Sequence, residues 1–95
     1  MPKARVLIAD DHGLVRKGLR FVLEREPDIE VVGEAGDGRE AVRLAEELDP
    51  TVVIMDIAMP FLNGIDAAAQ IVKRKPSTGV IMLSVHSDES YLLRA

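Results

Sequence analysis

The chain of 95 residues has no cysteine and no tryptophan, and its aromatic content is only 3%. Without cysteine it has neither a disulfide nor a thiolate metal site, which fits a domain in a reducing cytoplasm. Because aromatic rings are so few, its hydrophobic core must be aliphatic. The hydrophobic share of 47% is enough to build such a core and is well above that of a disordered chain.

Long apolar runs and an excess of positive charge are also missing. The longest apolar stretches fall far short of the roughly 20 residues that a membrane-spanning helix needs. Residues 1–5 run directly into a predicted strand, which leaves no room for a signal peptide. A net charge of −4 disfavours nucleic acid as the direct partner. We therefore expect a soluble cytoplasmic domain, a single unit of residues 1–95 with no membrane partner.

Hydrophobic periodicity predicts strictly alternating strands and helices. Apolar runs predict strands at residues 5–9, 29–35, 51–56 and 80–84, the second of them at an edge because it carries two glutamates. Helical spacing predicts helices at residues 13–25, 39–48 and 65–74, and a fourth that begins near residue 87. In the first helix we expect the apolar residues at helical spacing to face inward, and Arg16, Lys17, Arg20 and Glu24 to face outward. The inward set is Leu14, Val15, Gly18, Leu19, Val22 and Leu23. The alternation implies an α/β fold, a flavodoxin-like doubly wound parallel sheet with strand order 2-1-3-4.

The chain ends at Ala95, about two turns into the expected fourth helix. A fold of this kind usually continues with a fifth strand and a fifth helix, roughly 25 further residues. We therefore expect a C-terminally truncated domain, in which the fourth strand is an open edge and part of one sheet face is bare. Both features favour pairing with another chain, so we expect a homodimer or higher oligomer through that edge or that face.

Three aspartates follow predicted buried strands. Asp10 and Asp11 come directly after the first strand, and Asp56 ends the third. If these strands are parallel neighbours, about 4.8 Å apart, the carboxylates share one pocket at the carboxyl edge of the sheet, where ligands bind in such folds. Two carboxylates roughly 5 Å apart repel by about 3 kcal/mol at an effective dielectric constant of 20. A fold that tolerates this cost is expected to hold a hard, oxygen-binding cation such as Mg²⁺.

Other interpretations exist for several of these residues. Asp11 could instead cap the helix that begins near Gly13. His12 has no second His or Cys at zinc-ligand spacing, so a solvated loop histidine is expected, and the same holds for His86. Ser84 ends the fourth strand as Asp56 ends the third, so its hydroxyl is expected in the same pocket, with a turn-forming serine as the alternative. The glycine-rich segment 33–38 follows the wrong strand for a dinucleotide loop, and we interpret it as a turn.

Taken together, these motifs resemble a response-regulator receiver domain of two-component signalling. The resemblance is carried by Asp10-Asp11, residues 52–60, Gly64 and residues 80–84. Asp11-His12, residues 32–35, Leu83-Ser84 and His86 most resemble the subgroup joined to a LuxR-type helix-turn-helix. The resemblance implies a signalling module rather than an enzyme, with a histidine kinase as its partner and DNA contacted only through an output domain absent from this chain.

The resemblance also implies a role for each site residue. Asp56 would be the phospho-acceptor, and Ser84 the switch hydroxyl that bonds the phosphoryl group. Asp11 and Asp56 would bind Mg²⁺ directly, Asp10 directly or through water, and the Ala58 carbonyl would complete the protein ligands. Such assignments agree with phosphoryl transfer, which depends on positioning and on neutralising charge.

The chain departs from the family in two respects, and two rival interpretations follow. A lysine and an aromatic switch residue of the fifth strand would lie beyond Ala95, so we expect phosphorylation and signalling to be impaired or lost. A dehalogenase-type phosphohydrolase would need a second acid two residues after its nucleophile, where this chain has Ala58. The stronger rival is a non-signalling fold fragment or oligomerising building block with a vestigial acid site.

Overall fold

The structure, a computed structural model, describes residues 3–59 and 61–83. Its elements are β1 (Ala4–Ala9), α1 (Gly13–Glu24), β2 (Ile29–Ala35), α2 (Gly38–Leu48), β3 (Val52–Asp56), α3 (Gly64–Arg74) and β4 (Gly79–Leu83). The predicted alternation is confirmed, and each described boundary lies within one residue of its predicted position. The predicted fourth helix, Ser84 and His86 lie outside the described residues.

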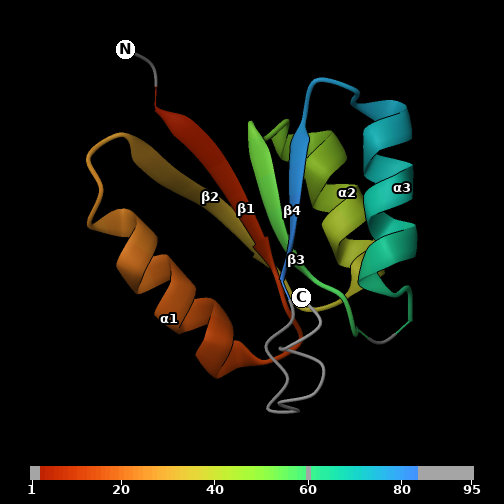
Figure 1. The fold of residues 1–95 in the computed structure, drawn as a ribbon, viewed down its shortest axis with the longest axis horizontal. Coiled ribbons are helices and arrows are strands. Elements are labelled where there is room, and N and C mark those ends of the chain that lie inside the picture. Colours follow the sequence, from red (N-terminus) through yellow and green to blue (C-terminus); the bar gives the residue numbers. More distant parts are fainter. Residues whose placement is uncertain (1–2, 60, 84–95) are drawn as a thin grey trace, which may run out of the picture.

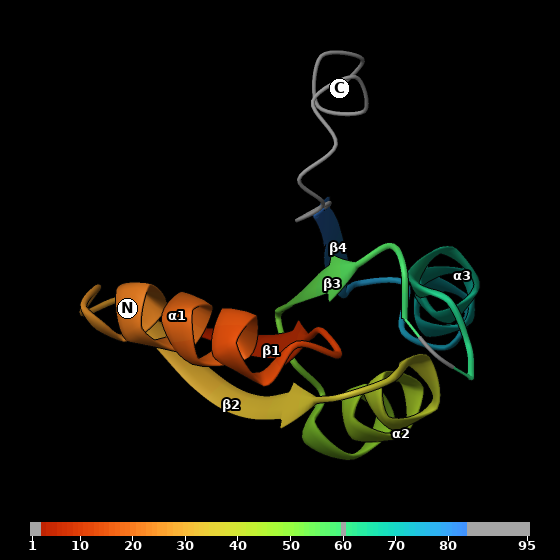
Figure 2. The ribbon, with the colours of Figure 1, turned by 90° about the horizontal axis from the view of Figure 1, so that it is seen from below.

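The four strands form one parallel sheet in the order β2-β1-β3-β4, as predicted. β1 and β3 are therefore direct neighbours, in register from Val6 opposite Val52 to Ala9 opposite Met55. Figure 1 shows α1 on one side of the sheet and α2 with α3 on the other, and Figure 2 shows the same layers from below. Among the described residues, no helix is long and apolar enough to cross a membrane.

The hydrophobic core lies in two parts because successive side chains of a strand point to opposite faces. The larger cluster lies between the sheet and helices α2 and α3, and Leu7, Val53, Met55 and Ile71 are its largest buried side chains. The smaller one lies beneath α1 and consists of Val6, Ile8 and Val31, with partly buried neighbours such as Leu19 and Leu23. β1 is thus covered on both faces, as its uninterrupted apolar sequence predicts.

Helix α1 presents only part of its predicted inward face to the sheet. Leu14 is 85% exposed and Val22 is 61% exposed, so the prediction that they face inward is wrong. Leu19 and Leu23 pack against the core, as predicted. Leu14 and Leu23 are nine residues apart, about 2.5 helical turns, and therefore lie on opposite sides of the helix. Arg16, about two turns before Leu23, then lies on the inner side, so the prediction that it points outward is also wrong.

Strand β4 lies at the edge of the described sheet, as expected from the strand order. Val80 and Met82 pack toward α2 and α3, whereas Ile81 points to the opposite face and is 50% exposed. No described helix covers that part of the sheet (Figure 2). The apolar sequence of this strand therefore does not lead to burial on both faces within the described residues.

Candidate functional site

The three aspartates that follow β1 and β3 converge at the carboxyl edge of the sheet. Carboxylate oxygens of Asp10, Asp11 and Asp56 and a ring nitrogen of His12 all lie within 4.8 Å of one another. Asp10 and Asp56 are buried, with 3% and 2% exposure, while the Asp11 side chain is 31% exposed. The predicted convergence is confirmed, and it follows from the parallel pairing of β1 with β3. Two of the three carboxylates are buried and the third is partly exposed, so the group is open to solvent on the side of Asp11.

Asp10 is held through both its backbone and its side chain. Its N–H donates to the Ala35 carbonyl oxygen at 3.0 Å, which continues the contact between β1 and β2. Its carbonyl oxygen accepts a hydrogen bond from Arg16 Nη1 at 2.6 Å, and its Oδ1 accepts one from the His12 N–H at 2.7 Å. These three bonds fix the direction in which the acidic pair leaves the strand.

The capping interpretation of Asp11 is not supported. The N-cap residue of α1 is His12, and its side chain makes no capping hydrogen bond. Within the described ranges, no backbone N–H donates to the Asp11 carboxylate, and the acid that bonds a backbone N–H in this turn is Asp10. Asp11 therefore remains available to bind a ligand in the pocket.

His12 takes part in the acidic group more directly than the sequence indicated. Its side chain is 58% exposed, as expected for a loop histidine, but Nδ1 lies 3.0 Å from Asp10 Oδ1 and 3.1 Å from Asp11 Oδ1. The hydrogen bond to Asp10 and then the charge of Asp11 raise the pKa of His12. When the ring is protonated, its charge offsets part of the repulsion between the two acids. The residue spacing carried a signal only for the backbone part of this contact, because an aspartate side chain often accepts a hydrogen bond from the N–H two residues further on, as Asp10 does from His12.

The loop after β3 is held against the sheet by close backbone contacts. The Gly64 N–H donates to the Ile57 carbonyl oxygen at 2.8 Å, and the Ile57 N–H donates to the Leu83 carbonyl oxygen at 3.2 Å. A Cβ atom on Gly64 would collide with the Asp56 carbonyl oxygen, so only glycine lets α3 begin this close to the strand. Ala58 is exposed, two residues after Asp56 in this loop. Ser84 lies outside the described residues, so its predicted place in the pocket stays a prediction.

Of the segment 33–38, which we interpret from the sequence as a turn, residues 36 and 37 form the turn, whereas residues 33–35 belong to β2 and Gly38 begins α2. The N-cap of α2 is Asp37, with a side chain that accepts a hydrogen bond from the Glu40 N–H at 2.8 Å. Glu40 in turn accepts one from the Gly36 N–H at 3.2 Å. These reciprocal bonds are those of a helix N-terminus and not of a phosphate-binding loop. A Cβ atom on Gly38 would collide with the Leu62 carbonyl oxygen, so this turn also packs tightly against the loop after β3.

Comparison with known proteins agrees with this geometry. Residues 6–95, which include all three aspartates, match the family model described as the response regulator receiver domain. The transcriptional regulatory protein DegU of Brevibacillus brevis is 44% identical over 90 residues, which are 95% of this chain and 38% of that protein. A protein-glutamate methylesterase/protein-glutamine glutaminase of Methanococcus maripaludis is 49% identical over 84 residues, 88% of this chain and 23% of that enzyme.

The agreement extends to solved structures. The signal receiver domain of NarL from Mycobacterium tuberculosis superposes with a TM-score of 0.86 at 33% identity, covering 99% of this chain and 76% of that one. The fold and the order of its strands are therefore those of known receiver domains. The chain spans about two fifths of the length of DegU and similar curated regulators, at 38 to 42% of each.

Proposed function

The chain belongs to the response regulator receiver domain family, and we propose that it acts as a phospho-acceptor in two-component signalling, with Asp56 as the residue that is phosphorylated. The observation that carries this proposal is the convergence of three carboxylates within 4.8 Å at the carboxyl edge of a parallel sheet. Asp56 lies at the end of a central strand and is 2% exposed, so its position is closely determined by the fold.

Mg²⁺ is the cation that the donor set fits. Asp10, Asp11 and Asp56 offer hard oxygen ligands, and the exposed loop at Ala58 offers a carbonyl oxygen nearby in sequence. Mg²⁺ is usually bound through one or two carboxylates and keeps several waters, which leaves positions for phosphoryl oxygens. The group contains one histidine and no cysteine, a poor set for zinc. When bound, Mg²⁺ would neutralise the charge that spreads over the transferring phosphoryl group.

The reaction assigned to Asp56 is nucleophilic. One carboxylate oxygen forms a bond to phosphorus while the bond from phosphorus to the histidine nitrogen of the kinase breaks, which gives an acyl phosphate. The buried position of Asp56 restricts the direction from which the phosphoryl group approaches. Asp10 and Asp11 would help to hold the metal, and Ser84 would donate its hydroxyl to a phosphoryl oxygen.

The partners proposed for this chain follow from the same function. A histidine kinase would donate the phosphoryl group, and the output would be transcriptional, since DegU is named as a transcriptional regulatory protein. The net charge of −4 agrees with DNA contact through another domain. The methylesterase relative is an enzyme, but the likeness covers only 23% of it, and we propose no enzymatic activity for the receiver itself. A cytoplasmic location and impaired phosphorylation of this chain taken by itself stay predictions.

Self-association is a second proposal, supported by a separate observation. Ile81 on the edge strand β4 is 50% exposed, and it lies on the part of the sheet that no described helix covers. On α1, Leu14 and Phe21 are 85% and 67% exposed. We propose a homodimer or higher oligomer through the β4 edge or this face. Sedimentation at micromolar concentration should show association that Ile81→Lys weakens, and a purely monomeric wild-type protein would contradict the proposal.

Exposure to beryllofluoride or acetyl phosphate with Mg²⁺ tests the phospho-acceptor proposal. We expect acetyl phosphate to add one phosphoryl group at the impaired rate predicted above, detected by intact-mass spectrometry, and beryllofluoride to shift the amide resonances around the pocket. Asp56→Asn should abolish both responses, while Asp28→Asn, which removes an exposed acid from the turn after α1, should leave them intact. If neither reagent acts on the wild-type protein, the interpretation as a fold fragment with a vestigial acid site replaces this one.

A further inference from the structure

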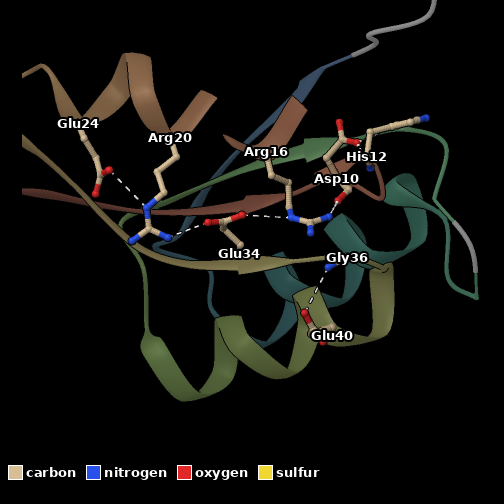
Figure 3. Close-up of polar contacts among 8 residues, drawn as sticks. All are labelled: Asp10, His12, Arg16, Arg20, Glu24, Glu34, Gly36 and Glu40. Carbon is tan, nitrogen blue, oxygen red and sulfur yellow. Dashed lines mark hydrogen bonds and ion pairs between the residues drawn. The ribbon is translucent and has the colours of Figure 1, made fainter. Parts of the chain in front are cut away.

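Arg16 connects the acidic turn after β1 to Glu34 of β2. The proposed receiver function gives this arginine no role. Its side chain is 24% exposed and points from α1 into the space between the turn after β1 and the turn after β2 (Figure 3). Nη1 donates to the Asp10 carbonyl oxygen at 2.6 Å, and Nε donates to Glu34 Oε1 at 3.2 Å. A Cβ atom on Gly13 or Gly36 would lie 3.7 Å from the guanidinium, so both turns lie against this group.

Glu34 is held from a second side. Arg20 Nη1 donates to Glu34 Oε2 at 2.7 Å, so each carboxylate oxygen accepts a hydrogen bond from a different arginine of α1 (Figure 3). The hydrogen bond from Arg20, followed by that from Arg16, lowers the pKa of Glu34 against the opposing effect of burial. Glu34 is therefore an anion at neutral pH and fixes the orientation of both guanidinium groups.

The Asp10 carbonyl is a sensitive point for such a contact. It belongs to the peptide group between Asp10 and Asp11, so a rotation of that peptide moves both carboxylates at once. The Asp10 N–H, which belongs to the preceding peptide group, is fixed by Ala35, and the hydrogen bond from Arg16 restrains the peptide group between Asp10 and Asp11. Ligand groups must be held within about 0.5 Å of their working geometry to bind well.

We propose that Arg16 is a positioning residue of the acidic pocket, which orients Asp10 and Asp11 for a divalent cation, and that Glu34 holds Arg16 in place. The proposal rests on the Mg²⁺-binding function proposed above. Arginine suits the task because its planar fork reaches two acceptors on different elements, a carbonyl oxygen on one side and a carboxylate on the other. Lysine, with one ammonium group, keeps the charge but cannot hold both in the same way.

The sign of the effect separates this proposal from two simpler ones. By charge alone, removing a guanidinium beside a cation site should strengthen Mg²⁺ binding, because two positive charges repel. If Arg16 served stability alone, a folded variant should bind Mg²⁺ as the wild type does. Positioning instead predicts weaker binding in Arg16→Met, by about tenfold, the lower end of what is lost when a partner that orients a metal ligand is removed.

The test is a Mg²⁺ titration of the full chain by calorimetry, with the unfolding free energy of each variant measured in a chelator. Arg20→Met is the matched control. It also removes one positive charge and one of the two arginines that bond Glu34, but Arg20 does not contact Asp10. We expect the Mg²⁺ affinity of this variant to change by less than about twofold. Arg16→Lys and Glu34→Gln should each weaken Mg²⁺ binding several-fold. These two variants replace Arg16→Met in the test if Arg16→Met does not fold. The His12 amide resonance, whose N–H bonds Asp10 Oδ1, should shift in metal-free Arg16→Lys but not in Arg20→Met.

The outcomes are distinct. Weaker Mg²⁺ binding in the Arg16 variants with an unchanged Arg20→Met supports the proposal. Equal or tighter binding in folded Arg16 variants overturns it and leaves the proposed function standing. A wild-type chain that binds no Mg²⁺ at all overturns the proposed function, and the positioning role of Arg16 with it.

Discussion

Replacing Asp56 by asparagine should stabilise the metal-free protein. Asp10 and Asp56 are both buried, and their carboxylate oxygens lie within 4.8 Å of each other. At an effective dielectric constant of about 20, this pair alone repels by about 3.5 kcal/mol. The more exposed Asp11 adds less because solvent screens it, and the buried amide gives back about 1 to 2 kcal/mol through imperfect hydrogen bonding. We therefore expect a net gain of about 2 kcal/mol in the free energy of unfolding.

The assay is urea denaturation in a chelator and again with saturating Mg²⁺. The wild type should gain about 2.7 kcal/mol when Mg²⁺ reaches about a hundred times its dissociation constant. Asp56→Asn should gain much less, so the advantage of the variant should vanish or reverse when the metal is present. Asp28→Asn, an exposed acid outside the pocket, should stay within about 0.5 kcal/mol of wild type in both conditions. An Asp56→Asn protein that is less stable than wild type in the chelator, or that responds to Mg²⁺ as strongly, would refute the electrostatic reasoning.

Three further predictions concern the framework that holds the pocket. Gly64→Ala forces a Cβ atom into the backbone at the end of β3 and should cost about 3 kcal/mol in urea denaturation, whereas Gly18→Ala, with nothing within 4 Å, should stabilise the helix by up to about 1 kcal/mol. Leu7→Ala empties a fully buried position and should cost about 2 to 5 kcal/mol, against under about 0.5 kcal/mol for Leu14→Ala at an 85% exposed one. Because hydrogen-bonded guanidinium groups lower the pKa of Glu34 below its ordinary 4.5, its contribution to stability is present above that value and is lost as the pH falls through the lowered pKa. Glu34→Gln should flatten this part of an acid-unfolding curve, and an identical curve would contradict the ion-pair geometry.

Much of the fold and of the site could be predicted because the signals are local. An uninterrupted apolar run marks β1 as buried on both faces, and the parallel neighbour that covers such a strand follows from strict alternation with helices. Asp10 and Asp56 then share a sheet edge for the same reason, whatever the details of packing. The turn at residues 36–38 could also be predicted, because glycine and aspartate are typical of turns and Asp37 is a typical helix N-cap residue.

Other features depended on contacts between segments far apart in the sequence. The apolar residues of α1 are spread around the helix, so their spacing fits more than one inward face. In the folded protein Arg16 bonds Glu34 and the Asp10 carbonyl from the side of the helix that also packs Leu19 and Leu23 on the sheet. No pattern within residues 13–24 contains that information.

The amino-acid order by itself determined the layered α/β architecture and the meeting of three carboxylates, since both follow from periodicity and from the rule that parallel strands end at one edge. Only the tertiary structure decided how those acids are oriented: which guanidinium fixes their backbone, that His12 turns back onto them, and how closely Gly64 lets α3 approach β3. The physical reason is the distance along the chain between the residues that interact. Periodicity is set by neighbours a few residues away, whereas orientation is set by hydrogen bonds and van der Waals contacts between residues that only folding brings together.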